Sequence, residues 1–193
     1  MELKYTNESI TSPNGIDCFV LDTKSIDFSS APLGQKTKDT LVIRAKAGEM
    51  IDTINSDGNV ESTYITEEGD AVFYNNEKDR YVPVCDDGRR LKFNEIEGHN
   101  YRVTGFPSFM EIHDATKRPY GVFVVNTDKY RVLPEIIVLP TCLKDAFGPG
   151  QHQFLFEGAT LKQDPQTGLV TGIEKKAFDE TWEVLEEKKE SKK

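Results

Sequence analysis

The chain has 193 residues, of which 33 are acidic and 24 are basic, so its formal net charge is −9. This excess of negative charge argues against binding to phosphate backbones or anionic lipid, because both require clustered Lys and Arg, and we expect neither nucleic acid nor a membrane as a partner. With 11 Phe, 7 Tyr and one Trp, the composition also excludes a disordered acidic chain, which would contain few aromatic residues.

Short alternating or apolar runs separated by turn residues recur along the chain, which is the pattern of antiparallel β-structure. The sequence predicts strands at 16–21, 40–45, 61–66, 71–74, 80–84, 101–104, 121–125, 130–139, 153–156 and 169–173. A polar turn at 56–59 predicts a hairpin between 50–54 and 60–65. We therefore expect a mainly β fold, built as an antiparallel sandwich or as barrel-like sheets.

The segments 25–38 and 104–119 are predicted to be long loops. We expect a single β-rich domain over 1–185, or two similar lobes at 1–104 and 120–185, followed by a solvated tail at 186–193. Near the C-terminus, Phe178, Trp182 and Leu185 recur at helical spacing and predict a helix with an apolar stripe. The alternative is a helical turn ending near Asp179, followed by a strand at 180–185.

No targeting or membrane-spanning pattern is visible. The N-terminal residues MELKYTNESITSPNG lack the basic start and apolar core of a secretory signal, and no apolar run approaches the roughly 20 residues of a membrane helix. We therefore expect a cytoplasmic protein. Cys18, Cys85 and Cys142 are too widely spaced for a disulfide framework or a paired zinc motif, so we expect reduced, mostly buried thiols and no metal site.

A pattern of turns and short strands runs from Ala47 to Val84 and is closed by an aromatic pair. The relevant positions are Glu61, Gly69-Asp70, Val72-Phe73, Asn75, Tyr81-Val82, and Phe178 with Trp182. This pattern resembles a module of small, uncharacterised phage and prophage proteins in which a Gly-Asp turn leads into short β-strands. The resemblance implies a bacterial or viral cytosol and supplies no catalytic residues. One way to account for the extra length of this chain is an internal duplication of the module, in which the second half repeats the order of elements.

The densest group of residues able to act as ligands or as a general acid and base is Glu111-Ile112-His113-Asp114. In an extended segment, alternation places Glu111 and His113 on one face, and folding can add a third ligand from His99 or His152. Glu111, His113, Asp114 and His152 are therefore the candidate catalytic residues of a hydrolase-like enzyme. The plainer interpretation is a loop histidine that is hydrogen-bonded to Asp114 or to a backbone carbonyl.

Other signals of chemistry are absent from the sequence. No nucleophile elbow, Walker-type loop or dinucleotide fingerprint occurs, so we expect no cofactor. Acidic residues at 67–70 and 86–87 are typical of solvated turns, with a calcium site as the alternative.

These observations favour a non-enzymatic cytosolic binding or accessory protein of phage or mobile-element origin. It would dock a protein partner through its acidic surface or bind a small molecule. The alternatives are the hydrolase-like enzyme and a virion-associated structural subunit.

Overall fold

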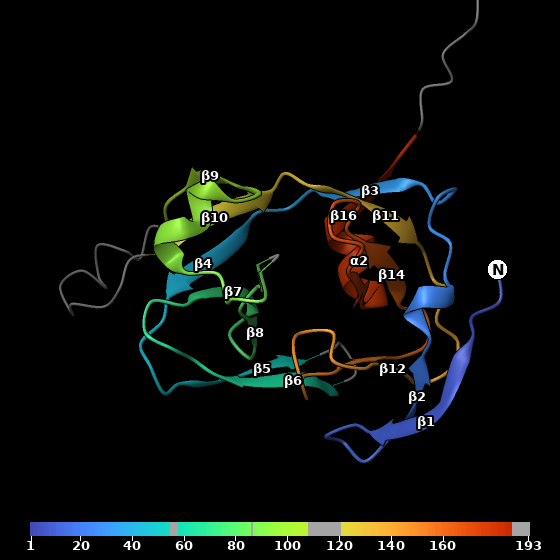
Figure 1. Ribbon diagram of the computed structural model, residues 1–193. Helices are drawn as coiled ribbons and strands as arrows, with labels where there is room; N and C mark the ends of the chain where they lie inside the picture. Colours follow the sequence, from blue (N-terminus) through green and yellow to red (C-terminus); the bar gives the residue numbers. More distant parts are fainter. Residues whose placement is uncertain (55–57, 86, 108–120, 187–193) are drawn as a thin grey trace, which may run out of the picture.

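The computed structural model describes residues 1–54, 58–85, 87–107 and 121–186. These residues form a mainly β structure, with sixteen strands in four sheets and one short α-helix near the C-terminus (Figure 1). The sheets are largely antiparallel, and the described strands form no closed barrel. The predicted mainly β class is confirmed.

One sheet has the order β1-β2-β12-β13. Its strands are β1 (Tyr5–Thr11), β2 (Asp17–Leu21), β12 (Thr141–Leu143) and β13 (Gln153–Leu155). Strands β2 and β12 are parallel, whereas the other pairs are antiparallel. The 3-10 helix η1 (Thr23–Ser25) follows β2.

A second sheet, at the upper left of Figure 1, has the order β8-β7-β4-β10-β9. Its strands are β4 (Thr40–Arg44), β7 (Ala71–Asn76), β8 (Asp79–Tyr81), β9 (Tyr101–Gly105) and β10 (Gly121–Asn126). The 3-10 helix η2 (Phe93–Gly98) precedes β9. Val42, Phe73 and Val124 from this sheet form a buried cluster with Leu91 and Ile96, which holds η2 against the sheet.

A third sheet, at the right of Figure 1, has the order β15-β14-β11-β3-β16. Its strands are β3 (Leu33–Lys36), β11 (Lys129–Leu133), β14 (Thr160–Gln163), β15 (Val170–Ile173) and β16 (Trp182–Leu185). Glu174 caps the N-terminus of the helix α2 (Lys175–Thr181), because its carboxylate accepts a hydrogen bond from the Ala177 N–H at 3.1 Å. The C-terminal prediction of a helical turn followed by a strand is therefore right, with the boundary at Trp182.

The remaining strands, β5 (Met50–Ile54) and β6 (Val60–Ile65), form a hairpin in which Met50 lies opposite Ile65. This confirms the pairing predicted from the turn residues. Strand β5 lies against β8, and β6 lies against β13. The hairpin therefore connects the second sheet to the first.

Two expectations about the chain path are wrong. Residues 25–38 are not simply a loop, since β3 lies within them and pairs with both β11 and β16. The strand expected over 130–139 ends at Leu133, and two residues later Glu135 has a positive φ of 51°. A left-handed residue interrupts the ladder there, because it turns the chain out of extended geometry.

The three larger sheets each combine strands from both halves of the sequence. The expected lobe boundary, the loop at 104–119 and the tail at 186–193 lie largely outside the described residues. The lobes and the internal duplication stay predictions. Over the described part of the chain, no helix has the length and apolar character required to span a membrane.

Candidate functional site

Of the predicted catalytic residues, Glu111, His113 and Asp114 lie outside the described residues, whereas His152 lies within them. Nδ1 of His152 accepts a hydrogen bond from the Asp145 N–H at 2.9 Å, and the Asp145 carboxylate lies 3.6 Å away. The imidazole also meets the Phe154 ring edge-on at 6.3 Å between centroids. These contacts give His152 a structural role in the turn before β13.

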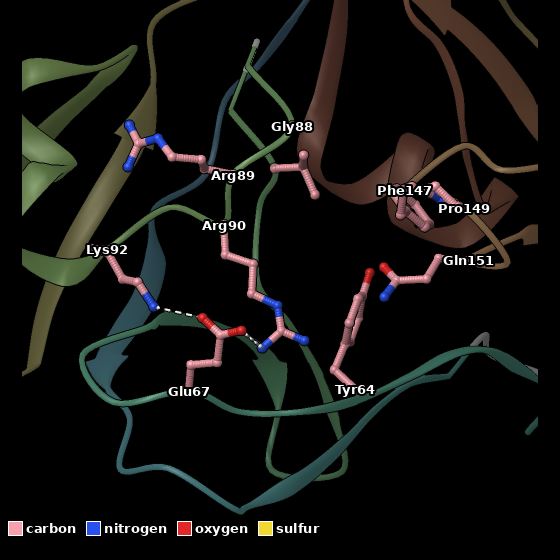
Figure 2. Close-up of a pocket in the computed structure, with 11 residues that line it drawn as sticks. Tyr64, Glu67, Gly88, Arg89, Arg90, Lys92, Phe147, Pro149 and Gln151 are labelled. Carbon is pink, nitrogen blue, oxygen red and sulfur yellow. Dashed lines mark hydrogen bonds and ion pairs between the residues drawn. The ribbon is translucent and has the colours of Figure 1, made fainter.

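The described residues form a pocket of about 380 Å³ elsewhere, between the 84–92 segment, β6 and the 147–151 loop (Figure 2). Its wall is both aromatic and charged. The lining residues are Tyr64, Glu67, Val84, Gly88, Arg89, Arg90, Lys92, Phe147, Gly148, Pro149 and Gln151.

Two isolated bridges shape one wall of this pocket. Val84 pairs with Arg90, and Asp70 pairs with Lys92, so the chain from 90 to 92 is extended. Alternation then points Leu91 into the core, where it is 2% exposed, and leaves Arg90 and Lys92 on the pocket side.

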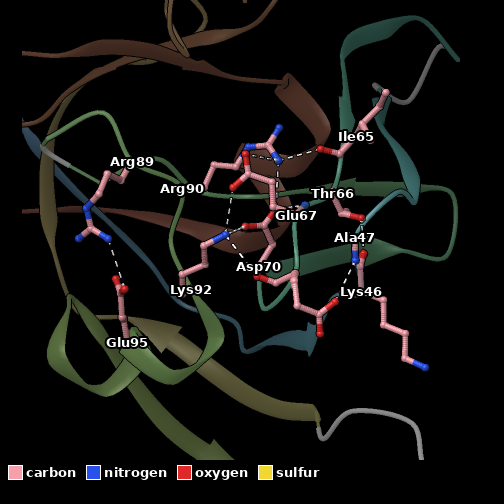
Figure 3. A network of polar contacts seen from close by, with 11 residues as sticks. Lys46, Ala47, Ile65, Thr66, Glu67, Asp70, Arg89, Arg90, Lys92 and Glu95 are labelled. Carbon is pink, nitrogen blue, oxygen red and sulfur yellow. Dashed lines mark hydrogen bonds and ion pairs between the residues drawn. The ribbon is translucent and has the colours of Figure 1, made fainter.

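Asp70 fixes these two cations from beneath (Figure 3). Its carboxylate is fully buried and lies 2.6 Å from Lys92 Nζ and 3.1 Å from Arg90 Nη1. It also accepts a hydrogen bond from the Glu67 N–H at 2.8 Å. A buried charge is tolerated when it is paired and hydrogen-bonded in this way. The hydrogen bond that Lys92 Nζ donates to Asp70 is also the main cause of the raised pKa of Lys92.

Besides its ion pair with Glu67 at 4.0 Å, Arg90 is held in one orientation by three closer contacts of its guanidinium. Nη1 donates to the Ile65 carbonyl at 2.7 Å and to Asp70, and the guanidinium lies 5.8 Å from the centre of the Tyr64 ring. Figure 2 shows the guanidinium beside Tyr64, with the Gln151 amide near the hydroxyl end of that ring. Nε and Nη2 make no hydrogen bond to any described residue. Within the described part of the chain, that edge of the guanidinium carries no hydrogen bond.

Arg89 lines the pocket with its backbone and directs its guanidinium the other way (Figures 2 and 3). Nε lies 2.6 Å from Asp87 and Nη1 lies 3.3 Å from Glu95. The guanidinium of Arg90 thus lies at the pocket, whereas the guanidinium of Arg89 pairs with Asp87 and Glu95, which do not line it.

Reasoning from the sequence missed this site because each part looks ordinary alone. The acidic residues at 67–70 were expected to be solvated, and this is wrong for Asp70, which is fully buried. The available signal was the alternation of Arg90, Leu91 and Lys92, which places two cations on one face of an extended segment.

The thiols agree with the expectation for Cys18 and Cys142, which are both buried. Burial raises the pKa of Cys18 to about 11 and that of Cys142 to about 12, so both are protonated at neutral pH. Cys85 is partly exposed.

Searches for relatives of the chain found no matching protein-family model, curated protein or solved structure. Function is therefore inferred from the chemistry of the pocket, and the resemblance to phage proteins stays a prediction.

Proposed function

We propose that this chain is a non-enzymatic binding protein whose ligand is a small carboxylate-bearing molecule held in the pocket between Tyr64, Arg90 and Gln151. The observation that carries the proposal is the fixed guanidinium of Arg90, whose Nε and Nη2 donors have no partner among the described residues. These donors lie on one edge of the guanidinium, which is the fork that binds a carboxylate through two parallel hydrogen bonds.

The rest of the pocket suits the body of such a ligand. A volume of about 380 Å³ falls within the range of small-molecule sites. Tyr64, Phe147 and Pro149 supply apolar surface, and Gln151 supplies an amide that can donate or accept. The wall therefore favours a ligand with an apolar part over a bare inorganic anion.

The charges around the pocket nearly cancel, so direct contacts, and not long-range electrostatic attraction, would recognise the ligand. Arg90 and Lys92 are balanced by Asp70 and Glu67, and the whole chain carries −9. Long-range attraction of an anion is consequently weak, and the directed donors of Arg90 must provide the affinity. Among the described lining residues, none is a His, Cys or Ser, which supports binding over nucleophilic catalysis.

The wider setting is part of the same proposal: a cytoplasmic accessory protein of a phage or mobile element, with an acidic surface that can meet a basic protein partner. The hydrolase-like enzyme with Glu111, His113, Asp114 and His152, and the virion subunit, stay predictions of the sequence.

The test is an NMR titration of the full chain with benzoate, citrate and inorganic phosphate, with benzamide as the neutral counterpart of benzoate. We expect benzoate to shift the resonances of Arg90 Nε–H and the Gln151 amide, and benzamide to leave them in place. Arg90→Lys keeps the charge that balances Asp70 and removes the fork, so it should weaken benzoate binding about 10-fold or more.

Arg102→Lys is the matched control, because Arg102 is exposed on β9 and does not line the pocket. Benzoate affinity should be unchanged in this variant. The proposal fails if none of the carboxylates shifts the pocket resonances, or if Arg90→Lys binds benzoate as tightly as the wild type.

A further inference from the structure

A thiol, a carboxylate and an imidazole meet beside the pocket, in a group that the proposed function does not use. Ligand atoms of Cys85, Glu95 and His99 all lie within 4.8 Å of one another, and His99 Nε2 is 3.7 Å from Glu95 Oε2. We propose that these three side chains bind one Zn²⁺ ion, which ties the turn at 85–88 to η2. This site goes beyond the proposed ligand pocket and does not depend on it.

The local fold positions two of the ligands on one face. Glu95 lies in the first turn of η2 and His99 caps the C-terminal end of that helix. His99 has extended backbone angles (φ −114°, ψ −163°), and its imidazole Nε2 lies 3.7 Å from Glu95 Oε2. Ile96, which is 2% exposed, holds η2 in the core, so the helix presents Glu95 and His99 from a fixed base.

Cys85 is delivered to the same place by a tight turn. Its N–H donates to the Arg89 carbonyl at 2.7 Å, and its carbonyl accepts from the Gly88 N–H at 2.9 Å. The turn returns the chain toward the 90–92 segment and η2. Cys85 also packs against the buried cluster that contains Ile96.

The carboxylate of Glu95 is arranged as a ligand. Oε1 accepts a hydrogen bond from Arg89 Nη1 at 3.3 Å, whereas Oε2 is buried and has no hydrogen-bond partner among the described residues. A buried oxygen left in this state costs free energy, and a cation on the His99 side of it removes that cost. Arg89 then acts as the outer partner that orients the ligating carboxylate (Figure 3).

The ligand set selects the metal. Thiolate and imidazole are ligands of Zn²⁺ and related transition metals, whereas Mg²⁺ and Ca²⁺ require oxygen ligands. Around a tetrahedral Zn²⁺ the ligand atoms lie about 3.4–3.8 Å apart, so the group must close by about 1 Å. Small side-chain rotations achieve this, because His99 is exposed and free to adjust. Three protein ligands leave the fourth position for water.

A metal here has a structural use. In the described residues from 82 to 99, regular structure is limited to isolated bridges and the 3-10 helix. Residues between 84 and 92 form one wall of the pocket, and Arg89 among them donates a hydrogen bond to Glu95 in η2. Zn²⁺ would add a second link between Cys85 and η2, beside the hydrogen bond that Arg89 donates to Glu95.

The test measures Zn²⁺ binding to the metal-free, reduced full chain by competition with a chromophoric chelator. We expect saturable binding of one Zn²⁺ per chain, and no competition from Mg²⁺ or Ca²⁺. Cys85→Ser, Glu95→Gln and His99→Gln should each weaken binding by at least about 100-fold, because loss of a ligand exceeds the usual cost of losing an outer partner.

Two matched controls separate this site from incidental binding. Glu97→Gln changes an exposed acid on the same 3-10 helix, and His152→Gln changes a histidine outside the group; both should bind Zn²⁺ as the wild type does. Alkylation of Cys85, followed by mass spectrometry, gives a second readout. Zn²⁺ should slow alkylation in the wild type and in Glu97→Gln but not in His99→Gln.

If Cys85→Ser fails to fold, His99→Gln still tests the Zn²⁺ site, because His99 is exposed and its replacement leaves the core intact. The proposal is overturned if the wild type shows no saturable Zn²⁺ binding, or if Zn²⁺ binds His99→Gln as tightly and protects its Cys85 equally.

Discussion

Asp70 and Glu61 are both buried carboxylates, but the charged groups around them have opposite signs. Asp70, just before β7, is 0% exposed and meets Arg90, Lys92 and the Glu67 N–H. Glu61, on β6, is 7% exposed, and its charged neighbours are the carboxylates of Asp79 and Glu174. One acid is surrounded by positive charge and the other by negative charge.

The consequence for Glu61 is a changed protonation state. Burial, followed by the charges of Asp79 and Glu174, raises its pKa to about 8. Glu61 is therefore mostly protonated at neutral pH, and the formal charge of −9, which counts it as ionised, overstates the negative charge of the folded chain. Burial of an acid alone thus does not show whether it is charged, because its neighbours decide.

The largest expected loss of stability comes from breaking the compensated site. Asp70→Asn preserves size and removes the counterion of Arg90 and Lys92, which are 20% and 31% exposed. We expect a loss of about 3 kcal/mol in the free energy of unfolding, measured by urea denaturation at neutral pH. The reason is that two partly buried cations lose their shared carboxylate.

Glu67→Gln is the control for this experiment, because Glu67 contacts the same cations but is 65% exposed. Its loss should cost less than about 1 kcal/mol. Equal effects of the two variants would show that the buried position of Asp70 adds nothing to the pairing.

A second effect comes from neutralising the uncompensated site with Glu61→Gln. In the wild type, folded Glu61 keeps its proton up to about pH 8, whereas the unfolded chain releases it near pH 4.5. The stability that this group contributes is fully present below pH 4.5 and is lost as the pH rises through 8, at about 1.4 kcal/mol per pH unit between those values. The free energy of unfolding of Glu61→Gln, relative to that of the wild type, should therefore increase progressively from pH 4.5 to about pH 8.

The measurement is urea denaturation of both proteins across this pH range, and the quantity of interest is the difference between them, since other groups titrate as well. Glu183→Gln, an exposed site on β16, should show no such trend. A constant difference between Glu61→Gln and the wild type would mean that Glu61 is ionised throughout.

The fold could be predicted where local chemistry determines it. The hairpin of β5 and β6 follows from turn residues between two alternating segments, and the helix-to-strand change at Trp182 was one of two interpretations considered. Strand β3 was missed because its sequence, LGQK, resembles a loop. Gly34 is required there by tertiary packing, since a Cβ at this position would lie 2.9 Å from Val132 Cγ1.

The candidate sites were harder to predict, because they depend on contacts between residues distant in the sequence. Tyr64 and Gln151 reach one pocket only through folding. The Cys85, Glu95 and His99 group is local, but it contains neither the paired cysteines nor the paired histidines that mark a metal site in a sequence. A mixed set spread over a turn and a 3-10 helix has no standard spacing, and the four-residue separation of Glu95 and His99 does not by itself mark a metal site.

The smallest expected effect separates burial from the charge of Asp79, which are the two largest of the three causes that keep Glu61 protonated. Burial is the larger cause and the charge of Asp79 is the next, so Asp79→Asn should lower the pKa of Glu61 by less than about one unit. The asparagine oxygen can still accept the Ile54 N–H, which Asp79 binds at 2.8 Å, so the hairpin contact is retained.

The readout is the pH titration of the Glu61 side-chain carboxyl carbon by NMR, with Asp52→Asn as a control because Asp52 is not among the causes of the shift. A fall of the pKa to the ordinary glutamate value would show that repulsion, and not burial, distinguishes Glu61 from Asp70. An unchanged pKa would assign the whole difference to burial without a cation.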